Sequence, residues 1–169
     1  MSRSFADQQL NFSARTRVRA AFRQLAADIN PNFFLTFDFG YLIKPQAAFP
    51  RLKGFCAAIE RRSLGRSWYK YQPPDRLVLL AFPERLDLNP HWHAVAHIPE
   101  PMVRSLWGYA SEIWLKYSPR AQRQLDFSRI DDVEKVISYV TKRTQVTNNL
   151  ENIFVYGPNS PKGANHEDL

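Results

Sequence analysis

Two short apolar segments, separated by six residues rich in turn formers, constrain this chain more than any other part of its sequence. Residues 76–84 (RLVLLAFPE) and 91–98 (HWHAVAHI) each have the length and the branched or aromatic content of a β-strand. A connection as short as RLDLNP favours a hairpin, so we expect the two strands to pair antiparallel. Pro83 has no amide hydrogen, so that end of the first strand should lie at an edge or a bulge.

The remaining segments alternate between helical and strand patterns. Helices are predicted over residues 13–30, 47–64 and 101–117 and from Asp131 past Lys142, and strands over 33–39, 125–130 and, less regularly, 66–71. The first helix should bury Val18, Phe22, Leu25 and Ile29. This order predicts an α+β fold, a central antiparallel sheet of four to five strands flanked by helices. We expect one domain over residues 1–156 and a flexible C-terminal tail over 157–169.

The distribution of charge favours a polyanionic partner. The chain has 23 Lys and Arg against 16 Asp and Glu, a net charge of +7. Residues 1–76 contain 13 of these basic and 5 of these acidic residues, so the whole excess lies in the first half. Arg15, Arg19 and Arg23 form a ridge on the predicted first helix. That ridge is either a grip on a nucleic-acid backbone or a solvated face, and both interpretations remain open.

Composition also excludes several protein classes. No unbroken apolar stretch is long enough to cross a bilayer, and the polar N-terminus lacks the apolar centre of a signal peptide. The single cysteine, Cys56, cannot form an internal disulfide or a multi-thiolate zinc site. The sequence therefore predicts a cytoplasmic protein with no membrane partner.

The second strand of the hairpin carries two histidines in an alternating pattern. His91 and His93 point to one face of a strand while Trp92 points to the other, so the two imidazoles can chelate one cation. Glu84 would lie opposite His91 in the proposed hairpin and add a carboxylate oxygen, leaving coordination positions open for water and substrate. Asp87 is the next candidate for the third ligand. Histidines that alternate by chance, with a solvated Glu84, are the other interpretation.

Two neighbouring polar residues are interpreted as structural. His97 shares the face of the other histidines, but four residues along a strand is about 13 Å, so we expect it to pack and not to bind. Thr36 should belong to a strand that supports the site.

A tyrosine on the predicted last helix is the candidate nucleophile. Val133, Val136, Ile137 and Val140 form its apolar stripe, and Tyr139 lies about 100° from that stripe. Lys135 and Lys142 fall on the side of Tyr139 and would favour its phenolate or hold a phosphate. A phenol has a reference pKa of about 10, so it needs a nearby cation to act as a nucleophile at neutral pH. A boundary tyrosine between two solvated lysines is the alternative.

Three motifs in this order resemble those of the HUH endonucleases: FLT at 34–36, HWH at 91–93 and YVTK at 139–142. The chain looks most similar to the single-tyrosine Rep-type nicking domains of rolling-circle replication initiators, with related domains in transposases. The resemblance covers about residues 33–143, and it implies a ferredoxin-like or RRM-like sheet. No second tyrosine lies three or four residues from Tyr139, which disfavours the two-tyrosine classes.

The resemblance implies a role for each matched residue. His91 and His93 would bind Mg²⁺ or Mn²⁺, with Glu84 as the third ligand. Tyr139 would attack a phosphodiester of single-stranded DNA or an origin hairpin, leaving a 5′-phosphotyrosine and a free 3′-hydroxyl. Lys142 would stabilise the added negative charge. Because the phosphotyrosine conserves the bond energy, the same site would rejoin ends.

The partners follow from the resemblance and from the basic composition. Residues that combine aromatic rings with cations are expected to hold the strand: Arg66, Trp68, Tyr69, Lys70 and Tyr71, together with Lys135. The alternative is that Trp68 and one of these tyrosines are buried core residues of a strand, and that choice remains open. The sequence has no P-loop, so unwinding would come from a host helicase, another partner or a further part of the protein.

Two rival functions remain open from the sequence. A noncatalytic nucleic-acid-binding domain would bind DNA without forming a covalent adduct. A zinc hydrolase would use His91, His93 and Glu84 and would not need Tyr139.

Overall fold

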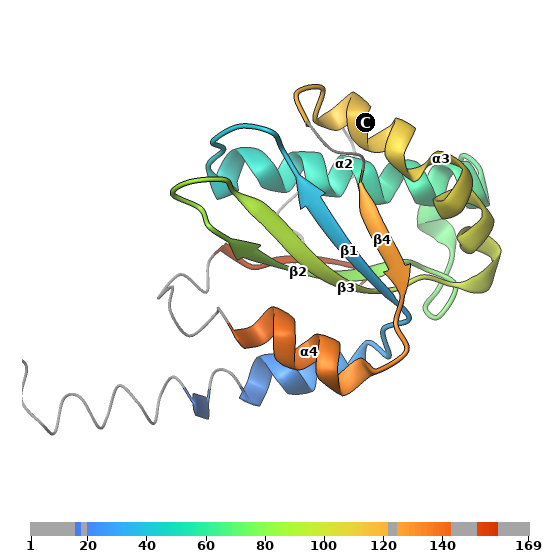
Figure 1. The fold of residues 1–169 in the computed structure, drawn as a ribbon. Coiled ribbons are helices and arrows are strands. Elements are labelled where there is room, and N and C mark those ends of the chain that lie inside the picture. The colour runs from blue at the N-terminus through green and yellow to red at the C-terminus, as the bar shows by residue number, and fades with distance from the viewer. Residues whose placement is uncertain (1–15, 18–19, 122–124, 143–151, 159–169) are drawn as a thin grey trace, which may run out of the picture.

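The computed structural model describes residues 16–17, 20–121, 125–142 and 152–158 of the chain (Figure 1). Its elements are β1 (Phe33–Asp38), α2 (Pro45–Leu64), the 3-10 helix η1 (Trp68–Lys70), β2 (Val78–Glu84), β3 (His91–His97), α3 (Glu100–Tyr117), β4 (Asp126–Arg129), α4 (Val133–Lys142) and β5 (Phe154–Tyr156). A helix over residues 20–28 precedes β1. The predicted α+β architecture, an antiparallel sheet flanked by helices, is confirmed.

All strand pairs are antiparallel, and the strand order is β4-β1-β3-β2-β5. The predicted hairpin is present, with Glu84 of β2 opposite His91 of β3. On the other side of β3, Thr36 of β1 lies opposite His93. The central strand β3 therefore brings residues from three strands together at one end of the sheet.

One face of the sheet packs against α2 and α3, as Figure 1 shows. The rings of Phe37, Phe55 and Trp114 meet there edge to face, with centroids 5.0 Å apart between Phe37 and Trp114 and 5.1 Å apart between Phe37 and Phe55. Trp92 is fully buried on this face against Phe39. This aromatic layer is the main hydrophobic core of the domain.

The opposite face packs against α4 and the helix over residues 20–28. Its smaller apolar cluster consists of Ala26, Leu80, Phe82, Val95, Ile137 and Val140. On the first helix the expected burial of Leu25 is wrong, because the packed stripe is Phe22, Ala26 and Ile29 and the small Ala26 side chain lets the helix approach the sheet. Val18, Arg15 and Arg19 lie outside the described residues.

Two segments differ from the predicted secondary structure. The strand expected over residues 66–71 is wrong, since this stretch forms η1 and buries Trp68 beneath the guanidinium of Arg76, 4.7 Å from the ring centroid. The strand β5 was not predicted, because a three-residue strand has little pattern of its own and forms by pairing with the distant β2. The expected tail, residues 157–169, lies outside the described residues from position 159 onward.

A buried carboxylate ties β5 and the start of β2 to α2. Glu60 accepts hydrogen bonds from two nitrogens of Arg76, from the backbone amide of Leu77 and from the hydroxyl of Tyr156. Both carboxylate oxygens are thus saturated, which offsets the desolvation of the charge. Burial, with the Glu60 charge adding to it, raises the pKa of the Tyr156 hydroxyl and of the Cys56 thiol, so both groups keep their protons.

The outer side of β2 is covered only in part. On this side β5 pairs with residues 79–81, and no described strand lies beside Pro83, whose partner Trp92 belongs to β3 on the inner side. This agrees with the expectation that the proline lies where a ladder hydrogen bond is not needed. No helix among the described residues combines the length and the apolar character needed to cross a membrane.

Candidate metal site and nucleophile

The β2–β3 hairpin places the three predicted ligands on the face that α4 covers. The register pairs Glu84 with His91 and Phe82 with His93, and side chains alternate along each strand. Both histidines therefore share a face with Glu84, while Trp92 is buried in the core on the other side. The expected position of Glu84 beside His91 is confirmed.

The ligand atoms of these residues converge on one point. Glu84 Oε2 lies 2.9 Å from Nε2 of His93 and 3.6 Å from Nε2 of His91. One ligand atom from each residue lies within 4.8 Å of the others, a separation that a single cation can bridge. The three side chains are 11–17% exposed, so the point of convergence is open on one side. Two nitrogens and one carboxylate oxygen suit a divalent cation that retains open coordination positions.

A second layer of polar atoms orients the imidazole of His91. Its Nδ1 lies 2.9 Å from the backbone carbonyl oxygen of Asn89. Because a carbonyl oxygen only accepts, Nδ1 must carry the proton and donate it. In this tautomer the lone pair of Nε2 can face a cation, as a histidine that binds a metal requires.

Thr36 has a more specific place than its expected supporting role. Its Oγ1 lies 3.1 Å from Nδ1 of His93, on the side of the ring away from Glu84. The 2.9 Å contact of Nε2 with the Glu84 carboxylate needs a proton on that nitrogen. When a cation takes the place of this proton, the Thr36 hydroxyl can accept the proton on Nδ1, as the Asn89 carbonyl does for His91. The sequence shows this threonine on a strand but gives no sign that β1 pairs with β3, and only that long-range register identifies its partner.

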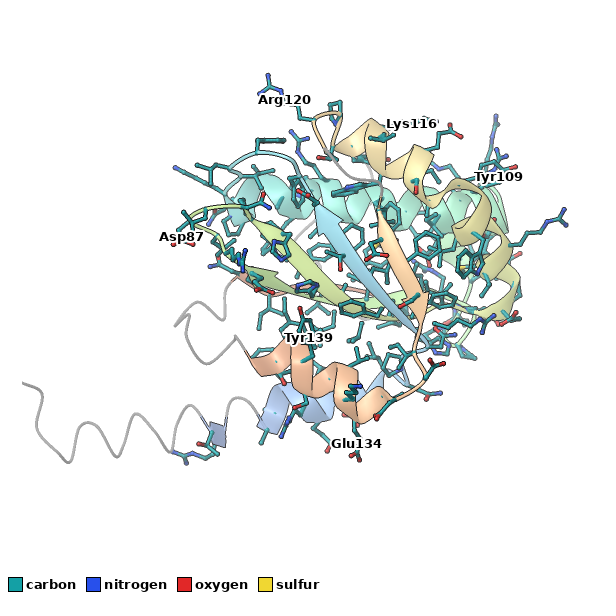
Figure 2. All side chains as sticks on the ribbon, in the orientation of Figure 1. Asp87, Tyr109, Lys116, Arg120, Glu134 and Tyr139 are labelled. Atoms are coloured by element: carbon teal, nitrogen blue, oxygen red, sulfur yellow. The ribbon has the colours of Figure 1, made fainter. Side chains whose placement is uncertain are left out.

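Tyr139 projects from α4 toward the same point (Figure 2). Ile137 and Val140 anchor the helix in the smaller core, while the Tyr139 side chain is 53% exposed. Its hydroxyl lies 3.5 Å from Nε2 of His93, at the outer limit of a hydrogen bond. The Phe34 ring meets both the Tyr139 ring and the His93 ring, with centroids 6.1 and 5.5 Å away. The structure thus brings the predicted nucleophile and the predicted ligands together.

One of the two predicted lysines of α4 belongs to a groove beside the first helix. Lys135 is exposed and lines a groove between α4 and the first helix, together with Arg23. Arg23, the described member of the predicted arginine ridge, donates a 2.7 Å hydrogen bond to Oγ of Ser138. It thus links the first helix to the residue before Tyr139. The side chain of Lys142 lies outside the described residues.

The predicted DNA-binding segment, residues 66–71, does not lie at the predicted metal ligands. It precedes β2, whereas Glu84 ends that strand, about 20 Å farther along at 3.3 Å per residue. Trp68 is buried, which settles its open interpretation in favour of the core, while Tyr69 and Tyr71 are exposed. Arg66 and Lys70 are also exposed.

The remaining candidates lie apart from the ligands. His97 is at the far end of β3, opposite Val78, and its Nδ1 is bonded to the backbone oxygen of Asn30. Asp87 is exposed at the tip of the hairpin, as Figure 2 shows, and it is not among the described groups that could share a cation.

Comparison with known proteins finds no matching family, no similar curated protein and no similar solved structure.

Proposed function

We propose that this chain is a metal-dependent, HUH-type nicking and joining enzyme that acts on single-stranded DNA through Tyr139. One observation carries the proposal. The Tyr139 hydroxyl lies 3.5 Å from Nε2 of His93, and that nitrogen also lies 2.9 Å from Oε2 of Glu84. A nucleophile held beside an open group of three ligands is the arrangement that phosphodiester cleavage by covalent catalysis requires.

The residues divide the chemistry between them. Glu84, His91 and His93 would hold the cation, and a bound cation withdraws charge from the non-bridging oxygens of the phosphate. The oxygen of Tyr139 forms a bond to phosphorus while the bond from phosphorus to the 3′-oxygen breaks. The phenolic proton leaves to water, which reaches the half-exposed ring, and the 3′-oxygen takes up a proton. The products are a 5′-phosphotyrosine and a 3′-hydroxyl, and the reverse reaction joins them.

Mg²⁺ or Mn²⁺ is the proposed working cation because the resemblance to the HUH endonucleases implies it. Two imidazoles and one carboxylate also form catalytic zinc sites, and zinc there would activate water and make Tyr139 unnecessary. The contact of Tyr139 with His93 is the feature that a zinc hydrolase would not need.

The test is covalent capture of DNA. Wild-type protein is incubated with Mn²⁺ and a pool of single-stranded oligonucleotides of randomised sequence, and denaturing electrophoresis then reveals any adduct of protein and DNA. We expect an adduct that the Tyr139→Phe variant cannot form, because phenylalanine has no oxygen to attack phosphorus. Tyr41→Phe, which removes the hydroxyl of a tyrosine packed against the main core on the other face of the sheet, is the control and should retain the adduct.

The same assay separates the rival functions. Adduct formation by Tyr139→Phe, or DNA cleavage that this variant performs at the wild-type rate, would contradict the proposal. A noncatalytic binding domain would give no adduct and would bind DNA equally well with a chelator present. A zinc hydrolase would lose activity in Glu84→Gln but not in Tyr139→Phe.

A further inference from the structure

The cations of α2 lie on the face of the sheet opposite the metal ligands. Arg61 and Arg62 occupy its last turn, and Arg51 and Lys53 precede them on the same helix. Figure 1 shows α2 and α3 on one side of the sheet and α4 on the other. Much of the basic excess of residues 1–76 is therefore directed away from Tyr139.

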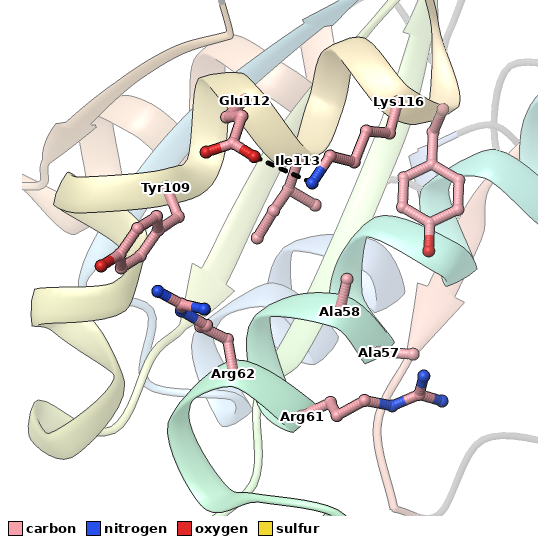
Figure 3. Close-up of a pocket in the computed structure, with 9 residues that line it drawn as sticks. Ala57, Ala58, Arg61, Arg62, Tyr109, Glu112, Ile113 and Lys116 are labelled. Carbon is pink, nitrogen blue, oxygen red and sulfur yellow. Dashed lines mark hydrogen bonds and ion pairs between the residues drawn. The ribbon is translucent and has the colours of Figure 1, made fainter.

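A groove of about 630 Å³ runs between α2 and α3 on this basic side (Figure 3). Small and apolar side chains such as Ala58 and Ile113 line its centre, and Tyr109 and Tyr117 line its walls. Gly54 fixes the position of one wall, because a Cβ there would lie 2.3 Å from a ring carbon of Tyr117. The groove is thus a consequence of how closely the two helices pack.

Neither of the two guanidinium groups of the groove forms an ion pair with a described carboxylate. Glu112 is the acidic residue of the lining, and it forms a 2.8 Å ion pair with Lys116. The hydrogen bond from Lys116, with the charge of Arg62 adding to it, holds the pKa of Glu112 below its ordinary value. Within the described part of the chain Arg61 has no carboxylate at ion-pair distance. Arg62 stacks on Tyr109, 3.9 Å from the ring centroid, as Figure 3 shows.

We propose that this groove is a second binding site, which holds the sugar–phosphate backbone of single-stranded DNA on the face away from Tyr139. The planar fork of a guanidinium binds phosphate oxygens in pairs, and stacking on Tyr109 preorganises that of Arg62. Aromatic rings between cations favour a nucleic-acid strand over an acidic peptide, because bases stack on them.

The proposal goes beyond the nicking function and does not depend on it. A strand held in this groove does not touch the metal ligands, so the groove would contribute affinity without taking part in bond cleavage. It predicts that the affinity for DNA and the covalent chemistry are separable by mutation.

The test is the double charge reversal Arg61→Glu with Arg62→Glu in the full chain. Affinity for a fluorescent oligothymidylate is measured by anisotropy in EDTA, which prevents cleavage, over a range of salt concentrations. We expect a loss of about tenfold at low salt and a decrease of about 1.4 in the slope of log affinity against log salt, the value for two lost phosphate contacts. The neutral pair Arg61→Gln with Arg62→Gln should show a smaller loss in the same direction.

A matched control makes the same change of charge elsewhere. Arg104→Glu with Arg120→Glu reverses two exposed arginines outside the groove. Equal losses in the control and the groove variant, or wild-type affinity in the groove variant, would overturn the proposal. So would polyglutamate of equal charge that binds the wild type as tightly as DNA does. Adduct formation by the groove variant at saturating DNA should match the wild type, and absence of an adduct in the wild type would refute the nicking function alone.

Discussion

The two faces of the sheet use the same strands for different purposes. Toward α2 and α3 the strands present large rings, and a buried ion pair there, between Glu60 and Arg76, is fully hydrogen-bonded. Toward α4 the strands present a small apolar cluster, and their remaining positions at one end of the sheet carry Glu84, His91 and His93. The comparison indicates that one face supplies most of the stability and so allows the other to expose reactive groups.

The strongest test of this comparison applies one chemical change to both faces. Glu60→Gln should lower the free energy of unfolding by about 3–5 kcal/mol, because it leaves the Arg76 charge buried without a partner. Glu84→Gln should change the stability of the metal-free protein far less, since its carboxylate faces an open site. Urea denaturation measures both variants. Equal losses would show that the two faces contribute equally to stability.

For the stabilisation by divalent cations, we expect Glu84→Gln to have a larger effect than Glu60→Gln. Mn²⁺ at about 100 times its dissociation constant should stabilise the wild-type protein by about 2.7 kcal/mol, because only the folded chain brings the three ligands together. Glu84→Gln should lose most of this gain, and a chelator should remove it. Glu60→Gln should retain the gain despite its lower stability. A gain of the same size in all three proteins would place the cation elsewhere.

The role of Thr36 allows a finer distinction within the face that carries the ligands. Thr36→Val keeps the shape of the side chain but removes the oxygen that contacts Nδ1 of His93. We expect Mn²⁺ affinity, measured by calorimetry, to fall about 10- to 100-fold. Thr141→Val is the control, since the Thr141 hydroxyl bonds to the Ile137 carbonyl in α4. An unchanged Mn²⁺ affinity in Thr36→Val would show that Thr36 does not orient His93.

The smallest expected effect concerns pH and the face toward α2. Because the folded state raises the pKa of Tyr156, its contribution to stability is complete below about pH 10, the unfolded value, and is lost as the pH rises above it. The loss should approach about 1.4 kcal/mol per pH unit. Tyr156→Phe should remove this part of the alkaline slope in denaturation experiments, with Tyr69→Phe as the control for loss of a phenol. An unchanged slope in Tyr156→Phe would show that Tyr156 does not titrate on unfolding.

Features fixed by neighbouring residues could be predicted from the sequence. The six-residue connection determines the hairpin, and the alternation of His91, Trp92 and His93 then determines which side chains share a face with Glu84. The amphipathic pattern of α4 likewise placed Ile137 and Val140 in the core and Tyr139 beside it. In each case the periodicity of one element was sufficient.

Features fixed by distant pairing could not be predicted. The contact of Thr36 with His93 requires the β1–β3 register, and β5 exists because it pairs with β2. The segment around Trp68 alternates in a way typical of a strand, yet burial of Trp68 against Arg76 outweighs that preference. The positive charge of residues 1–76 was visible in the sequence. Only the structure shows that the basic residues of α2 lie on the face of the sheet away from the predicted ligands.

Pro83 has a consequence for self-association. A strand edge with free amide and carbonyl groups can recruit a strand from another molecule, and a proline donates no hydrogen bond to such a strand. Pro83 stands immediately before Glu84, just beyond the residues of β2 that pair with β5. Along the described part of this edge, Pro83 therefore discourages a second copy of the chain from adding a strand next to Glu84, where such a strand would cover the candidate ligands.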